Sequence, residues 1–266
     1  MNLKLSVVSV VKNEEKNLRK TLNSVKDLAD EIIVVDNLST DKTVKIAKKY
    51  RAKIYYYAGQ SEGKQKLYGI DKTNNDWILF IDADEIVSSS LKKEIKELLR
   101  TKKQLKAGYF IPFQNHYLGK PVNYGGENYQ MLRLFNKKKV KVNLVPIHAG
   151  FELNQGEAGR LKNKIFHYSY RSIWQVLKKF KNYGQRSARV KYSQGERPNL
   201  RKLILNPVHM FWARFIESQG YRDGWFRLPL DLAFAYMEFI TYFYLTILTI
   251  KKFFLKKINQ WNQKLP

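Results

Sequence analysis

Apolar and polar positions follow two different periodicities over the first hundred residues, one typical of strands and one typical of helices. Short runs rich in β-branched residues predict four strands, at residues 5–11, 31–35, 53–57 and 77–81. Hydrophobic residues at helical spacing predict intervening helices over residues 18–25 and 43–50, a more polar helix before the fourth strand, and an amphipathic helix over 91–99. Strands that alternate with helices favour a parallel sheet with right-handed crossovers.

The pattern is less regular after residue 100. Residues 109–135 are typical of an antiparallel excursion, with glycines at its bends, and residues 172–190 predict a basic amphipathic helix. Residues 195–199 combine Gly, Pro and charge, which is typical of a linker. We therefore predict a catalytic domain over residues 1–195 and a helical, basic and aromatic extension over residues 196–266.

Residues 228–250 form an apolar stretch that is long enough to span a membrane. Asp231 and Glu238 interrupt it, and lysines follow it directly. Two acidic residues are costly at the centre of a bilayer, whereas a basic flank suits an anionic headgroup layer. We predict a helix that lies on the membrane surface, and a single transmembrane anchor stays open as the alternative.

Composition narrows the class of protein. The 266 residues are 44% hydrophobic, enough for a substantial core, which excludes wholesale disorder. Lys and Arg number 49 against 23 Asp and Glu, a formal net charge of +26 that indicates an anionic partner. Since the C-terminal aromatic residues accompany long aliphatic runs, we favour an anionic membrane surface over nucleic acid.

Cysteine usage and the N-terminus bear on location. The chain has no cysteine, which excludes disulfides and thiolate metal sites and fits a reducing compartment. The first eleven residues lack the long apolar core of a signal peptide. We expect a cytoplasmic protein that associates with the inner face of the cell membrane.

Three polar clusters follow predicted strands directly. They lie at residues 12–14, 36–39 and 82–85, and each carries a carboxylate. Ligands of open parallel sheets bind at the carboxyl ends of the strands, so these clusters should converge on one crevice. The turn after the first strand lacks the glycines that a dinucleotide-binding fold needs, which argues against a nicotinamide-dependent oxidoreductase.

The Asp-Ala-Asp-Glu sequence at residues 82–85 is suited to a diphosphate ligand. Carboxylates repel a pyrophosphate unless a divalent cation lies between them, held by hard oxygen ligands. Such a cation stabilises the charge that develops on a leaving nucleoside diphosphate. Each cluster also has a purely structural interpretation. Asp82 and Glu85 would cap the helix that follows, Glu14 would be a cap or a first-turn charge, and Asp36 would form an Asx turn.

Together, these segments resemble a known family. Val-Val-Ser-Val-Val-Lys-Asn-Glu-Glu (7–15), Asp-Glu-Ile-Ile-Val-Val-Asp-Asn-Leu-Ser-Thr-Asp-Lys-Thr (30–43) and Trp-Ile-Leu-Phe-Ile-Asp-Ala-Asp-Glu (77–85) are similar to glycosyltransferase family 2, which has the GT-A fold. Segments 131–135, 166–170 and 220–224 resemble its branch of lipopolysaccharide core glucosyltransferases. The resemblance implies an α/β, Rossmann-like, mostly parallel sheet that binds a nucleotide-diphospho-sugar, followed by the C-terminal helical membrane-associating extension.

The resemblance also implies roles for single residues. Asp36 would contact the nucleotide base, Asp82 the ribose or the metal, and Asp84 the metal and the diphosphate. The expected cofactor is Mg²⁺ or Mn²⁺. Asn13 and Glu14, at the end of the first strand, are further candidates for donor binding. Arg133 is suited to holding a phosphate bidentately, or to pairing with an internal carboxylate.

Family members of this kind invert the anomeric centre and need a general base for the acceptor hydroxyl. Similar proteins show His followed by Glu where this chain has His148, Ala149 and Gly150, so the expected base is missing from its place. We take Glu127 and Glu152 as substitutes, and His148 as a third candidate because its unperturbed pKa lies near working pH.

The sequence therefore predicts an inverting, metal-dependent glycosyltransferase. Its donor would be a nucleoside diphosphate sugar, in the first instance a UDP-sugar, and its acceptor lipopolysaccharide core or another lipid-linked glycan. Transfer to a polyprenyl phosphate carrier is the alternative within the same chemistry. A catalytically inactive membrane-bound scaffold with this fold is the alternative from another class, and the missing Glu after His148 is what favours it.

Overall fold

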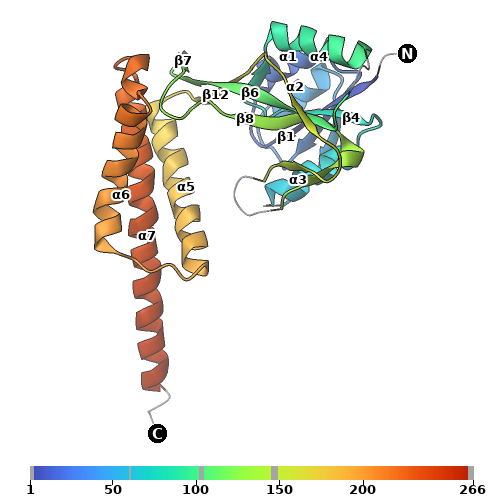
Figure 1. The fold of residues 1–266 in the computed structure, drawn as a ribbon. Helices are drawn as coiled ribbons and strands as arrows, with labels where there is room; N and C mark the ends of the chain where they lie inside the picture. Colours follow the sequence, from blue (N-terminus) through green and yellow to red (C-terminus); the bar gives the residue numbers. More distant parts are fainter. Residues whose placement is uncertain (1–2, 60, 102–104, 145–148, 263–266) are drawn as a thin grey trace. The chain divides into compact units, whose positions relative to one another are not determined.

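The computed structural model describes residues 3–59, 61–101, 105–144 and 149–262. The chain divides into two compact units. The first comprises Met1–Asn115 and Asn128–Ser169, and the second comprises His116–Glu127 and Tyr170–Pro266. In Figure 1, the blue-to-yellow sheet and its helices are the first unit, and the orange and red helices belong to the second.

A parallel sheet begins the first unit. Its strands lie in the order β3-β2-β1-β4 and are mutually parallel. They are β1 (Leu5–Val11), β2 (Glu31–Asp36), β3 (Lys53–Tyr56) and β4 (Trp77–Phe80). Because β2 and β4 lie on opposite sides of β1, the residues that follow both strands reach the same edge of the sheet. This is the arrangement that the alternating pattern predicts.

Helices cover both faces of this sheet (Figure 1). On one face, Val7 and Leu79 pack with residues of α1, α2 and α4, and on the other Val8 and Ile78 pack with Ile70 of α3. The helices are α1 (Leu18–Val25), α2 (Thr43–Lys49), α3 (Glu62–Asp71) and α4 (Ser89–Thr101). Neighbouring strand residues point to opposite faces, so continuous apolar strands are buried on both sides.

An antiparallel part extends the sheet beyond β4, in the order β8-β6-β12-β5. These strands are β8 (Gln130–Asn136), β6 (Gly108–Tyr117), β12 (Ile165–Tyr170) and β5 (Glu85–Val87). Short strands β7 (Lys120–Val122) and β11 (Ala158–Arg160) pair with β6, and β9 (Val140–Val142) pairs with β10 (Phe151–Leu153). A 3-10 turn, Lys137–Lys139, joins β8 to β9.

The second unit is helical. Its long helices are α5 (Ile173–Ser193), α6 (Leu200–Trp212) and α7 (Arg227–Asn262), with a π-helical turn at Ala213–Glu217 and a 3-10 turn at Gly220–Asp223. Tyr117 and Val122 of the β6–β7 hairpin complete its core with Phe180 of α5 and Leu230 of α7. Gly184 lets α5 approach α7 closely, because a Cβ there would lie 2.8 Å from the backbone oxygen of Met237.

The structure confirms the predicted fold class. The sheet is mostly parallel in its first part, helices flank it, and an apolar helix follows near the C-terminus. Among the described residues, one helix is long and apolar enough to cross a membrane, over Arg227–Lys252.

Two features differ from the sequence-based expectation. Helix α6 lies inside the extension predicted to be helical, but the sequence analysis does not give it bounds of its own, and it continues through Pro207. The compact units also divide elsewhere than at residue 195, since α5 packs with α7 and so belongs to the helical unit. Whether residues 1–195 act as the catalytic domain stays a prediction.

Candidate functional site

Asp36 ends β2, and its carboxylate is almost fully buried. Its Oδ2 accepts a hydrogen bond of 2.9 Å from the backbone N–H of Ser39, which is the local turn that the sequence predicts. The other oxygen, Oδ1, is buried and has no hydrogen-bond partner among the described residues. A buried carboxylate oxygen without a donor is costly. Asp36 therefore retains an acceptor position that a ligand N–H or O–H would satisfy.

Asn13 and Glu14 tie the loop after β1 to the loop after β2. Asn13 adopts a left-handed conformation (φ 54°), which Asn tolerates better than most residues. Its Oδ1 accepts from the backbone N–H of Thr40, and the backbone N–H of Glu14 donates to Oγ1 of Thr43. The Glu14 carboxylate accepts from Nδ2 of Asn17. In this structure both residues shape the loops around Asp36, and their contact with a donor stays a prediction.

Arg133 of β8 is buried and holds the loop after β4 in place. Its Nη2 donates to Oδ2 of Asp82 over 2.7 Å and to Oε1 of Glu85 over 2.6 Å. Glu85 also accepts from the backbone N–H of Asp82. Of the two interpretations of Arg133, the structure shows pairing with internal carboxylates. The pair leaves Asp82 at the surface, with 36% of its side chain exposed.

The two carboxyl groups of this loop, Asp82 and Glu85, differ in the direction in which their pKa values are shifted. Burial raises the pKa of Asp82, but the attraction of Arg133 and of Lys66 outweighs it and holds that pKa well below its usual range. Burial raises the pKa of Glu85, and Arg133 does not fully offset this, so the Glu85 pKa lies above its ordinary value. Asp82 is therefore the ionised, solvent-facing member of the pair.

Asp84 lies beside His167 of β12. The Nε2 of His167 is 3.4 Å from Oδ2 of Asp84, and the two segments are joined by a backbone hydrogen bond from Tyr168 to Asp84. The Nδ1 of His167 lies 2.9 Å from Oδ1 of Asn115, which also accepts from the hydroxyl of Tyr129. With Nδ1 as the protonated nitrogen, Nε2 presents its lone pair toward Asp84.

Lys66 of α3 is a buried cation that sequence reasoning did not single out. Its Nζ donates to the backbone oxygen of Ala149, pairs with Glu62 at 2.6 Å and lies over the rings of Phe80 and Phe151. Its charge contributes to the low pKa of Asp82. The only sequence signal was its place in the polar helix before β4. Lys66 and Arg133 together add positive charge near the carboxylates, where a diphosphate would need it.

The three candidate bases have different surroundings. His148 lies outside the described residues. Glu152, on β10, pairs with Lys141 and accepts from Nδ2 of Asn143, and about half of its side chain is exposed. Glu127 belongs to the second unit, where it is buried and pairs with Arg214 and, at 3.8 Å, with Arg227. The assignment of a base stays a prediction.

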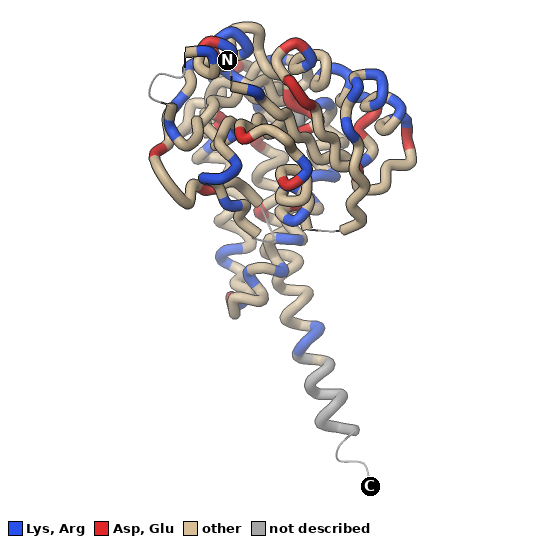
Figure 2. The backbone as a smooth tube through the Cα atoms, turned by 90° about the vertical axis from the view of Figure 1, so that its right-hand side faces the viewer, with Lys and Arg blue, Asp and Glu red and all other residues tan. Residues whose placement is uncertain are grey.

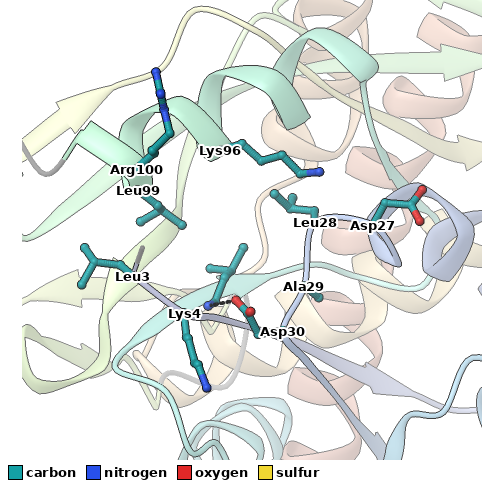
Figure 3. Close-up of a pocket in the computed structure, with 10 residues that line it drawn as sticks. Leu3, Lys4, Asp27, Leu28, Ala29, Asp30, Lys96, Leu99 and Arg100 are labelled. Atoms are coloured by element: carbon teal, nitrogen blue, oxygen red, sulfur yellow. Dashed lines mark hydrogen bonds between the residues drawn. The ribbon is translucent and has the colours of Figure 1, made fainter. Parts of the chain in front are cut away.

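A hollow in the first unit lies at the opposite edge of the sheet, where β1 and β2 begin (Figure 3). It has a volume of about 660 Å³ and is lined by residues that precede β1 and β2, among them Lys4 and Asp30, and by Lys96 and Arg100 of α4. Asp36 and Asp82, in contrast, follow the carboxyl ends of their strands. Ligands of open α/β sheets bind at the carboxyl ends, so this hollow does not displace the candidate site.

The register of the sheet brings the predicted residues to one edge. Asp36 pairs with Val11 at the end of β1, and Phe80, two residues before Asp82, pairs with Val8 on the other side of β1. His167 pairs with Glu85 across β12 and β5. Asp36 therefore offers an unsatisfied buried acceptor at the end of β2, and two partly exposed carboxylates, Asp82 and Asp84, lie beside His167 after β4, with β1 between the two strands.

Comparison with known proteins identifies the family of the chain. The family described as "Glycosyl transferase family 2" matches residues 6–153. An uncharacterized glycosyltransferase of Rickettsia typhi is 31% identical over 93% of this chain and 88% of its own length.

More distant proteins are also similar. The lipopolysaccharide core biosynthesis glycosyltransferase LpsC of Rhizobium meliloti is 26% identical over 84% of each chain. Among solved structures, residues 1–349 of TarS from S. aureus are 14% identical, with a TM-score of 0.45 over 89% of this chain and 90% of that one. The chain belongs to glycosyltransferase family 2, whose members transfer a sugar from a nucleotide-sugar donor.

Proposed function

We propose that the protein is an inverting glycosyltransferase that moves a sugar, in the first instance from a UDP-sugar, to lipopolysaccharide core or another lipid-linked glycan at the cytoplasmic face of the membrane. The observation that carries the proposal is the grouping of Asp82, Asp84 and His167 at the strand edge that Asp36 also reaches. The similarity to LpsC, named for lipopolysaccharide core biosynthesis, supports this acceptor class.

The residues fit a divalent cation such as Mg²⁺ or Mn²⁺. Asp84 supplies a hard oxygen ligand. Nε2 of His167 lies 3.4 Å from Oδ2 of Asp84, close enough for both atoms to bind one ion when the imidazole carries its proton on Nδ1. Within the described residues there is no group of three or more side chains that could hold a metal. The chain would thus contribute two ligands, Asp84 and His167, and the ion would take the others from substrate phosphates and water.

Asp82 is suited to the ribose rather than to the metal. Its Oδ2 is held by Arg133, which fixes the carboxylate, and a third of the side chain faces solvent. A fixed, ionised carboxylate is a good acceptor for the two ribose hydroxyls. Asp36, with its buried Oδ1, would accept from the base. The divalent ion would supply the positive charge that offsets the charge on the departing diphosphate.

Of the two candidate bases that the structure describes, Glu152 is the more accessible to an acceptor. Its carboxylate is half-exposed, and its partners are a surface lysine and an amide. Glu127 is 4% exposed and faces two guanidinium groups, so an acceptor hydroxyl would have to displace a buried ion pair. We therefore propose Glu152 ahead of Glu127 as the group that removes the acceptor proton.

Hydrolysis of nucleotide sugars tests the proposal. The wild-type chain is incubated with UDP-glucose, UDP-galactose and UDP-N-acetylglucosamine in Mn²⁺ or Mg²⁺, and release of UDP is measured. We expect slow release from at least one donor, abolished by chelation of the metal. Asp84→Asn should lower the rate by at least about a hundredfold, because it removes the charged ligand.

Asp76→Asn is the matched control. Asp76 lies directly before β4, whereas Asp84 lies after it, and among the described residues the side chain of Asp76 forms an exposed ion pair with Lys138 and no other hydrogen bond or ion pair. The Asp76→Asn variant should release UDP at a rate within about twofold of the wild-type rate. If no UDP-, ADP- or GDP-sugar binds or turns over with any divalent metal, the proposal fails. That result would favour the alternative of a catalytically inactive scaffold. Supplying lipopolysaccharide core and polyprenyl phosphate separately distinguishes the two acceptor classes.

A further inference from the structure

Helix α6 has an unusual surface for a helix of a water-soluble unit. Apolar residues recur at every fourth position from its start into the following π-helical turn, and all of them are exposed. They are Leu200, Ile204, Val208, Trp212 and Ile216. None of the thirteen residues of α6 is buried. A contiguous apolar surface that faces water marks an interaction site.

Helix α7, which lies alongside α6, carries a second exposed apolar stripe (Figure 1). Its members, separated by three, four or seven positions, fall within an arc of about 80° at 100° per residue. They are Leu232, Phe239, Phe243, Ile247, Ile250 and Phe254. The opposite side of α7 is the buried one, where Leu230 and Leu245 lie.

Cations and tryptophans flank both stripes. Arg201 and Lys202 lie at the start of α6, and Lys251 and Lys252 lie near the C-terminal end of the α7 stripe, between Ile250 and Phe254, all four of them exposed. Figure 2 shows Lys and Arg positions along the helical unit. Trp225, between the two helices in sequence, is 85% exposed. Tryptophan and lysine beside an apolar surface are typical of a membrane interface.

From these features we infer that α6 and α7 together form a docking surface for an anionic phospholipid bilayer, with both apolar stripes embedded at the headgroup boundary and neither helix crossing the membrane. This refines the membrane location proposed above, and it is independent of the transfer chemistry. The new element is α6, which places Trp212 in the bilayer interface.

The packing of α5 explains why α7 lies on the membrane instead of spanning it. The buried face of α7 is covered by α5, which is in close contact through Gly184. The outer face of α5 exposes Lys178, Lys181 and Arg189. A span over this length of α7 would carry these cations into hydrocarbon, at a high cost. With α7 in the plane of the membrane, they stay in water.

Charge also favours a bilayer over a second copy of the chain. The chain carries a formal net charge of +26, and exposed cations lie at the start of the α6 stripe and near the end of the α7 stripe. Two copies that met through these stripes would bring like charges together, whereas an anionic lipid surface attracts each cation.

Vesicle sedimentation tests the surface. The full chain is mixed with phosphatidylcholine vesicles that contain or lack phosphatidylglycerol. We expect binding to the anionic vesicles that weakens with salt. The triple variant Ile204→Ser, Val208→Ser, Trp212→Ser should lower the apparent partition coefficient about tenfold or more, since it removes three apolar side chains from the bilayer. The control Leu67→Ser, Leu144→Ser alters exposed apolar residues of the first unit and should bind like wild type.

Further readouts distinguish the in-plane arrangement from a membrane span and from a contact between two copies. Quenching of Trp212 fluorescence, obtained by difference from Trp212→Phe, should be stronger with lipids brominated near the headgroup than near the chain end. Stronger quenching at the chain end would overturn the in-plane arrangement. If the triple variant binds vesicles as well as wild type does, the role of α6 is overturned. The role of α6 is also overturned if the wild-type chain is a dimer in solution and the triple variant is a monomer that still binds vesicles like wild type. Circular dichroism checks that the triple variant folds. In the absence of vesicles, the triple variant should hydrolyse the donor at the wild-type rate. A loss of vesicle binding is then distinct from a loss of sugar-transfer chemistry.

Discussion

Each unit buries one arginine among carboxylates, and the two clusters differ in what they leave exposed. In the first unit, Arg133 pairs with Asp82 and Glu85, and Asp82 keeps 36% of its side chain in solvent. In the second, Arg227 forms a bidentate pair with Asp231, both N–O distances being 2.8 Å, and both side chains are fully buried. The first cluster is open to a ligand and the second is closed.

The closed cluster also satisfies its arginine more completely. The guanidinium of Arg227 donates to the backbone oxygens of Tyr124 and Gly125, and Asp223 lies 3.5 Å away. A side chain at Gly125 would collide with Arg227, which explains the glycine there. Arg133, in contrast, has a buried Nε without a hydrogen-bond partner among the described residues. We interpret the closed cluster as a fastening of the β6–β7 hairpin to the helices, and the open one as part of a binding site.

The largest effect on stability is expected at the closed cluster. Arg227→Met removes the guanidinium that neutralises Asp231. The buried carboxylates around this position then keep their negative charge without a matching cation. The free energy of unfolding should fall by about 3–5 kcal/mol, the usual cost of breaking a buried ion pair. Urea unfolding measures it. Arg222→Met, at an exposed arginine of the same unit, is the control and should change stability by less than about 0.5 kcal/mol. A loss below about 1 kcal/mol at Arg227 would mean that water reaches the cluster.

A smaller loss of stability, coupled to a loss of donor binding, is expected at the open cluster. Arg133→Met removes the partner of Asp82, but water can solvate that carboxylate, so the free energy of unfolding should fall by about 2 kcal/mol. Nucleotide affinity should fall as well, because the carboxylate is no longer held in place. Calorimetric titration with UDP and Mn²⁺ on the folded variant measures this. If the Arg133→Met variant binds UDP as tightly as wild type does, Arg133 has a purely structural role, like Arg227. The proposed difference between the open and the closed cluster would then be wrong.

Local sequence patterns predicted the strands and the strand-end carboxylates. Strand periodicity and turn chemistry act within a few residues, so Asp36, Asp82 and Asp84 could be placed at strand ends without tertiary information. The fold class followed from the alternation of strands and helices. What the sequence could not supply is which partner each carboxylate meets.

Those partners come from distant parts of the chain. His167 reaches Asp84 through the pairing of β12 with β5, across about eighty residues. Lys66 has the sequence context of a surface lysine, and its burial depends on Phe80 and Phe151 from separate strands. Glu127 follows two glycines and resembles a solvated charge, yet Arg214 and Arg227 enclose it. Long-range pairing of this kind leaves no periodic signal.

The most direct test of the candidate site is a crystal structure of the protein soaked with UDP and Mn²⁺. We predict the metal on Asp84 and Nε2 of His167, the ribose on Asp82, and the uracil within hydrogen-bonding distance of Oδ1 of Asp36. UDP bound elsewhere, for instance in the hollow beside Lys4 and Arg100, with Asp84 and His167 making no contact to metal or phosphate, would contradict this assignment.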